Sequence, residues 1–99
     1  YMKINKNETI LQVNILKEGK EYIAYSPALD ISSCGKSEAE AKRNLGSAVK
    51  LFLDELQEMG TLDDALFELG WRKADNPRYN WIPPQLLNST VRVSLPRNR

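Results

Sequence analysis

One long amphipathic segment, between Ser37 and Gly60, constrains the fold more than any other part of the sequence. Its apolar residues recur at spacings of three and four: Ala41, Leu45, Ala48, Val49, Phe52, Leu56 and Met59. This spacing predicts an α-helix with one apolar stripe, and charged residues fall mostly on the other side. Such a stripe must be buried, so the rest of the chain has to supply a surface for this helix to cover.

Local signals mark both ends of this helix and one unusual position inside it. Ser37 and Glu40 have the spacing of a capping box, in which the serine caps the Glu40 amide and the glutamate caps the serine amide. Gly60 follows the stripe and favours a left-handed helix end. Gly46 costs about 1 kcal/mol relative to alanine in a helix interior, and a close approach of helix and sheet is one reason that would explain it.

The residues before the helix predict a sheet. Residues 9–16 alternate, with Leu11, Val13 and Ile15 on one face and Gln12 and Asn14 on the other. A polar stretch at 17–20 leads into residues 22–25, which are rich in aromatic and branched side chains and complete a hairpin. Pro27 ends regular pairing or marks an edge, and residues 29–34 supply a short third strand.

The residues after the helix predict three further parts. Residues 61–69 form a short helix with Leu62, Ala65, Leu66 and Leu69 on one face, and Gly70 ends it. Residues 71–88 contain Pro77, Pro83, Pro84, Tyr79 and Trp81, which favours a folded-back loop with anchored aromatic residues. Residues 90–95 alternate Val91, Val93 and Leu95 with Arg92 and Ser94, as in a closing strand that returns to the sheet. We therefore expect an α+β fold: an antiparallel three-stranded sheet plus this closing strand, a long helix on one face and a short second helix.

Composition narrows the class of protein. At 99 residues the chain has the size of one domain, which we place at 1–99. Its composition, with 41% hydrophobic and 27% charged residues, is ordinary for a globular protein. No apolar run approaches the roughly 20 residues that cross a bilayer, and the start of the sequence lacks a signal-peptide stretch, so we expect a cytoplasmic protein without a membrane partner. The single cysteine, Cys34, cannot form an internal disulfide, which fits a reducing compartment.

The residue types give little support to an enzyme. The sequence has no histidine to activate Cys34, no glycine-rich phosphate loop, no metal-spaced Cys/His set and no serine elbow. We therefore expect no catalytic, cofactor-binding or metal-binding residues and no cofactor. The net charge of +1 supplies no general attraction to nucleic acid.

The stretch 21–49, EYIAYSPALDISSCGKSEAEAKRNLGSAV, resembles the most recognisable part of the HicB-like antitoxins. In that family a Tyr-x-Ala-x-x-Pro strand end leads through a short loop to Gly-x-Thr/Ser and a helix opening Glu-Ala-x-x-Asn. The matching positions are Tyr22, Ala24, Pro27, Leu29, Gly35, Ser37, Glu40, Ala41 and Asn44. The resemblance implies the family's partial ribonuclease H-like fold. The loop between Pro27 and Gly35 departs from it by lacking the glycine that often follows the proline.

The resemblance also implies a function. Antitoxins of this family bind and mask a small mRNA-cleaving toxin of the HicA kind, and usually continue into a DNA-binding domain. This sequence stops at PRNR, so we expect no C-terminal DNA-binding domain. A homo-oligomer through sheet faces or edges is also expected. The residues we predict for partner binding are Tyr22, Tyr25, Asp30, Trp71 and Trp81. Period two places one of the two tyrosines on the face away from the helix without determining which.

Two alternatives remain open. The first is a stand-alone HicB-like RNA-binding or regulatory protein whose cations gather into a patch: Arg72, Lys73, Arg78, Arg92, Arg97 and Arg99. The second is a metal-dependent nuclease, suggested by the name of the fold, that would use Asp30 with Asp54 or Glu55. Charges at Asp54 and Glu55 are more typical of a solvated helix surface.

Overall fold

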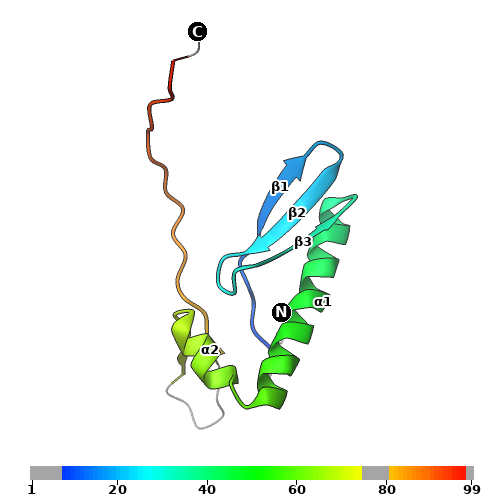
Figure 1. Cartoon of the computed structure of the whole chain (residues 1–99), viewed down its shortest axis with the longest axis vertical. Helices are drawn as coiled ribbons and strands as arrows, with labels where there is room; N and C mark the ends of the chain where they lie inside the picture. Colours follow the sequence, from blue (N-terminus) through cyan, green and yellow to red (C-terminus); the bar gives the residue numbers. More distant parts are fainter. Residues whose placement is uncertain (1–7, 75–80, 98–99) are drawn as a thin grey trace, which may run out of the picture.

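The chain forms a three-stranded antiparallel sheet covered on one face by a long helix, with a short second helix beyond it (Figure 1). The structure, a computed structural model, describes residues 8–74 and 81–97. The elements are β1 (Asn14–Glu18), β2 (Glu21–Ser26), β3 (Ile31–Gly35), α1 (Glu38–Met59), α2 (Leu62–Glu68), β4 (Arg72–Lys73) and β5 (Trp81–Ile82). The sheet order is β1-β2-β3, and β4 pairs with β5 in a separate antiparallel ladder. The predicted α+β class, the three-stranded sheet and both helices are confirmed.

The register of the sheet separates its two faces. Ile15 lies opposite Ala24, which in turn lies opposite Ser33, and these residues face α1. The first strand begins at Asn14, later than the predicted residue 9. Leu11 and Val13 precede it, yet both are half-buried against the core, so the predicted apolar face is retained without strand pairing.

The N-terminus of α1 is capped nearly as predicted. The Ser37 hydroxyl accepts the Glu40 amide at 3.1 Å. The Glu40 carboxylate accepts the Lys36 amide at 3.0 Å, so the predicted bond to the serine amide is wrong by one residue. Ser37 has the extended backbone that is usual for an N-cap residue. At the other end Gly60 has φ 73°, which confirms the left-handed terminus.

The close approach of helix and sheet occurs at Gly35, and not at Gly46, where it was one reason considered for the glycine. A Cβ on Gly46 would meet no atom within 4 Å, because this residue lies on the exposed surface of α1. A Cβ on Gly35 would lie 2.6 Å from the Ala41 amide nitrogen and 2.9 Å from Glu40. The first turn of α1 therefore sits directly on the end of β3, in a space that only glycine leaves open.

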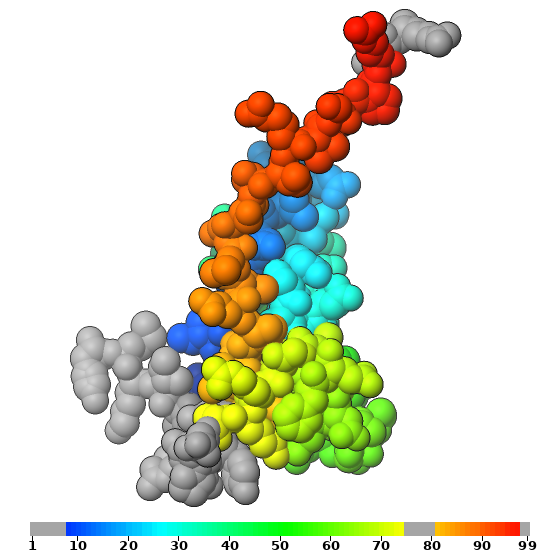
Figure 2. Space-filling model, turned by 90° about the vertical axis from the view of Figure 1, so that its left-hand side faces the viewer, coloured from blue at the N-terminus to red at the C-terminus, as the bar shows by residue number. Residues whose placement is uncertain are grey.

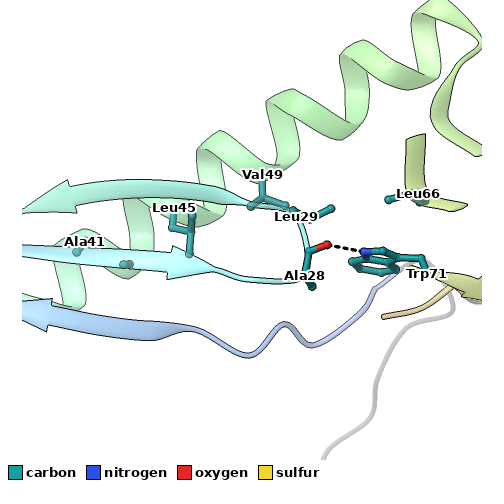
Figure 3. Close-up of a cluster of buried hydrophobic side chains, with 8 residues drawn as sticks. Ala28, Leu29, Ala41, Leu45, Val49, Leu66 and Trp71 are labelled. Atoms are coloured by element: carbon teal, nitrogen blue, oxygen red, sulfur yellow. Dashed lines mark hydrogen bonds between the residues drawn. The ribbon is translucent and has the colours of Figure 1, made fainter. Parts of the chain in front are cut away.

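The core lies between the sheet, α1 and the end of α2 (Figure 3). Its buried members are Ala24, Ala28, Leu29, Ala41, Leu45, Val49, Leu66 and Trp71. The Trp71 indole donates a hydrogen bond to the Ala28 carbonyl at 2.8 Å, which ties the segment after α2 to the turn after β2. Met59, the last residue of the predicted stripe, is exposed, so the stripe is buried only over its earlier part.

The predicted closing strand at residues 90–95 is not part of the sheet. Residues 83–97 have no regular secondary structure, and they pass alongside the sheet as an extended tail that projects beyond it (Figures 1 and 2). Leu87, Val91, Val93 and Leu95 are 79%, 82%, 68% and 85% exposed. Pro83 and Pro84 lack backbone donors and favour extended backbone, so the chain leaves β5 in a fixed direction instead of folding back.

The chain folds back within residues 71–88, as predicted, because the segments on either side of residues 75–80 pair with each other. Trp71 is buried, and β4 pairs with β5 through Arg72 with Ile82 and Lys73 with Trp81. Pro77, Arg78, Tyr79 and Arg99 lie outside the described residues. Neither helix in the described part of the chain has both the length and the apolar character needed to cross a bilayer.

Candidate protein-binding face

Helix α1 covers one face of the sheet and leaves the other face bare. The strand register places eight side chains on this bare surface, which we call the open face: Asn14, Leu16, Glu18, Glu21, Ile23, Tyr25, Ser32 and Cys34. Its central row runs across the three strands through Leu16, Ile23 and Cys34. Leu16 is 57% exposed, and Cys34 is an exposed free thiol. The open face therefore presents an apolar centre to solvent.

Tyr25 is held in place by Asp30. Its hydroxyl donates to the Asp30 carboxylate at 2.9 Å, across the turn that joins β2 to β3. In this turn the Asp30 amide donates to the Ser26 carbonyl at 2.8 Å, and Asp30 has φ 56°. Aspartate adopts this left-handed conformation more readily than most residues. The hydrogen bond to Asp30 is the main cause that raises the pKa of Tyr25, with partial desolvation and the charge of Asp30 adding to it. The phenol is therefore a protonated donor of fixed orientation.

Carboxylates lie at both ends of the open face. Glu18 and Glu21 are directly opposite each other at the hairpin end, and Asp30 follows β2 at the other end. The eight side chains of the open face include no lysine or arginine. An apolar centre between acidic ends suits a partner that has an apolar patch flanked by cations.

Three of the five predicted partner-binding residues, Tyr22, Trp71 and Trp81, lie away from the open face. Tyr22 points to the α1 side of the sheet, where it is half-buried against the core with the Lys17 amine 5.6 Å from its ring centroid. Trp71 is 4% exposed, and its ring fills the core beneath the turn after β2. Of the two tyrosines between which the sequence did not decide, Tyr25 faces away from the helix.

Trp81 belongs to a separate cluster beside α2. Its ring meets Phe67 edge-to-face at 5.1 Å between centroids, and the Lys73 amine lies 5.3 Å from the Trp81 ring centroid. Lys73 also pairs with Asp63 at 2.8 Å. The structure thus brings Tyr25 and Asp30 together at one end of the open face and places Trp81 in this second cluster.

Sequence reasoning missed the central row of the open face. Ile23 shares its face with Tyr25 by simple alternation, and Leu16 is an apolar residue one position out of the period set by Leu11, Val13 and Ile15. That break in the period was the available signal. The alignment of Leu16 with Ile23 and Cys34 depends on strand register, which no single strand encodes.

Several residues that carry the resemblance have structural roles. Gly35 allows the close approach of α1, while Ser37 and Glu40 cap this helix. The Asn44 amide donates to the Cys34 carbonyl at 2.8 Å and fixes α1 on β3. The 21–49 pattern therefore describes how the helix is joined to the sheet.

The carboxylates considered for a nuclease are not gathered into a site. Asp54 pairs with Lys50 at 2.9 Å on the exposed surface of α1, whereas Asp30 bonds Tyr25. Within residues 8–74 and 81–97, no group of three or more His, Cys, Asp or Glu is arranged to hold a metal ion.

Comparison of the chain with family models, curated proteins and solved structures gave no match.

Proposed function

We propose that this chain is a protein-binding domain: a HicB-like antitoxin domain of the cytoplasm that binds and neutralises a small mRNA-cleaving toxin of the HicA kind. The observation that supports this function best is the open face. It is an uncovered sheet surface with Leu16 and Ile23 at its centre, carboxylates at its ends and no cation among its side chains. The resemblance of residues 21–49 to the antitoxin family supplies the class of partner.

The chemistry of such a toxin fits this surface. A protein that cleaves RNA has to attract phosphates, so its RNA-binding surface carries lysine and arginine. Glu18, Glu21 and Asp30 would attract those cations and raise the association rate. Leu16 and Ile23 would supply the desolvated centre that holds the complex together. Tyr25, already oriented by Asp30, would lose little conformational freedom on binding.

The first experiment is a pull-down of the protein, tagged at its N-terminus, from its own cell extract, with mass spectrometry of what co-purifies. A stoichiometric small basic protein whose expression alone arrests growth, and whose effect is relieved by this chain, is the expected result. Recovery of the chain alone would count against the antitoxin function. Recovery with RNA only, weakened by salt and by neutralising Arg72, Arg78 and Arg97, would favour the stand-alone RNA-binding alternative.

A matched pair of substitutions tests the open face itself. Leu16→Lys puts a charge in its centre, whereas Leu51→Lys puts the same charge on the exposed side of α1. The two leucines are 57% and 61% exposed, so both variants should remain folded. We expect Leu16→Lys to weaken toxin binding by about tenfold or more and Leu51→Lys to leave it nearly unchanged. Equal effects of the two substitutions would place the binding surface elsewhere.

A further inference from the structure

The C-terminal tail is a strand without a partner. Residues 90–95 alternate apolar and polar side chains, yet Val91, Val93 and Leu95 are each more than two-thirds exposed. Among the described residues, no backbone hydrogen bond joins residues 85–97 to the body. Apolar alternation of this kind is typical of a strand with one buried face. The pattern predicts pairing that one copy of the chain does not provide.

The root of the tail is fixed, which sets its direction. Trp81 and Ile82 are paired with β4. Pro84 lies next to Gly70, where an added Cβ would be 3.6 Å from the Pro84 Cβ. Beyond Leu86 every described tail residue is exposed. The tail passes the β1 side of the molecule and continues past it into solvent (Figure 2). Two successive prolines at its root oppose the bend that pairing within the same chain would require.

The sheet has two edges, and β1 is the freer one. Helix α1 packs mainly over β3 and β2, and at β3 the Cys34 carbonyl already accepts the Asn44 amide. Edge strands with open backbone groups recruit further strands. β1 is five residues long, about 17 Å, and residues 91–95 match that length.

An apolar groove adjoins the N-terminal end of β1 on the helix side of the sheet. It has a volume of about 850 Å³, between α1 and the segment that leads into β1, and it is mostly apolar. Its apolar lining consists of Leu11, Val13, Leu45, Val49, Leu53 and Leu62. A strand added to the edge of β1 and continued along the segment before it would turn every second side chain toward this groove.

We propose that the tail of one copy pairs with the β1 edge of a second copy and that the exchange is mutual, giving a symmetric dimer. Val91, Val93 and Leu95 enter the groove of the partner copy. Arg92 and Ser94 then turn to the opposite side of the sheet, the side on which β1 carries Glu18. An isologous exchange of identical strands closes with two-fold symmetry and leaves no unpaired tail. It adds a strand beside the open face without covering that face, and it does not depend on the identity of any toxin.

A second matched pair of substitutions tests the exchange in the full chain. Val93→Lys places a charge on the apolar side of the tail, and Ser94→Lys places it one residue later on the other side. Both positions are exposed in the single copy, so circular dichroism and melting should match the unaltered protein. By sedimentation over micromolar to submillimolar concentrations, we expect a dimer that Val93→Lys weakens about tenfold or more. Ser94→Lys should change its affinity by less than about threefold.

Hydrogen exchange distinguishes exchange between copies from pairing within one. Amides of residues 91–95 and the outward amides of β1 should become protected together as the dimer forms. A chain that stays monomeric over this range would overturn the exchange. A dimer equally affected by both substitutions, or tail protection already present in the monomer, would overturn it as well. Toxin binding is not read in these measurements, so their failure is separate from failure of the antitoxin function.

Discussion

At the residue scale, two glycines of similar appearance in the sequence have opposite roles. Gly35→Ala would place a methyl group against the Ala41 and Glu40 backbone, which cannot move without shifting the start of α1. We expect this substitution to lower the free energy of unfolding by about 1–3 kcal/mol. Gly46→Ala meets open space inside a helix, so it should raise that free energy by about 0.5–1 kcal/mol.

Urea unfolding of both variants, at a protein concentration where the chain is monomeric, measures this contrast. A Gly35→Ala variant as stable as the unaltered protein would show that α1 does not press on the end of β3. The contrast also shows the limit of sequence reasoning at Gly46. Helix propensity identifies a glycine as unfavourable, but only the packing shows whether a side chain at that position would clash.

The bond between Tyr25 and Asp30 makes a prediction about pH. Because the fold raises the pKa of Tyr25 above its ordinary value of 10.0, the bond stabilises the fold fully below that value. This contribution is lost as the pH rises through the pKa of the folded protein. In Asp30→Ala the pKa of Tyr25 should fall toward its ordinary value. Tyrosinate absorbance, taken as the difference from a Tyr25→Phe variant, measures the titration, and an unchanged midpoint would contradict the role of Asp30.

At the scale of the element, α1 was the most predictable part of the molecule. Its cap, its stripe and its glycine end are local signals, and the structure has this helix at residues 38–59. The three strands of the sheet were predicted near their observed positions, although β1 begins at Asn14 and not at residue 9, because alternation marks a strand without marking where pairing begins. The two-residue strands β4 and β5 were missed, since they form only where residues 72–73 and 81–82 meet.

The N-cap of α1 gives the prediction for this scale. Ser37→Ala removes the acceptor of the Glu40 amide and should lower the free energy of unfolding by about 1 kcal/mol. Ser47→Ala is the control, because this exposed serine only donates back to the Arg43 carbonyl within the helix. We expect the control to be neutral or slightly stabilising. Thermal or urea unfolding measures the free energy of unfolding of both variants. An equal loss of stability in the two would show that the Ser37 cap does not stabilise α1.

At the scale of the whole molecule, the tail is independent of the folded body. The radius of gyration is 16.7 Å, against roughly 13 Å for a compact domain of about 100 residues, and the projecting tail accounts for the elongated shape. Deleting residues 87–99 removes described side chains that are all exposed. For the monomer we expect the free energy of unfolding to change by no more than about 0.5 kcal/mol.

Small-angle scattering of the dilute protein tests the same prediction. The radius of gyration should fall toward roughly 12 Å in the shortened chain. A large loss of stability on deletion would mean that the tail packs on its own body in solution. In that case residues 90–95 would pair with the sheet of their own chain, as the sequence predicted.

The sequence by itself determined the α+β class, the long helix with both of its ends, the hairpin and the short second helix, because each depends on residues close together in the chain. The tertiary structure decided which face of the sheet stays bare and that Tyr25, not Tyr22, lies on it. It also decided that Leu16, Ile23 and Cys34 align, that Trp71 is core, and that residues 90–95 do not return to the sheet. These outcomes depend on strand register, on which edge a strand can reach and on the direction set by two prolines. They are long-range geometric conditions that local periodicity does not contain.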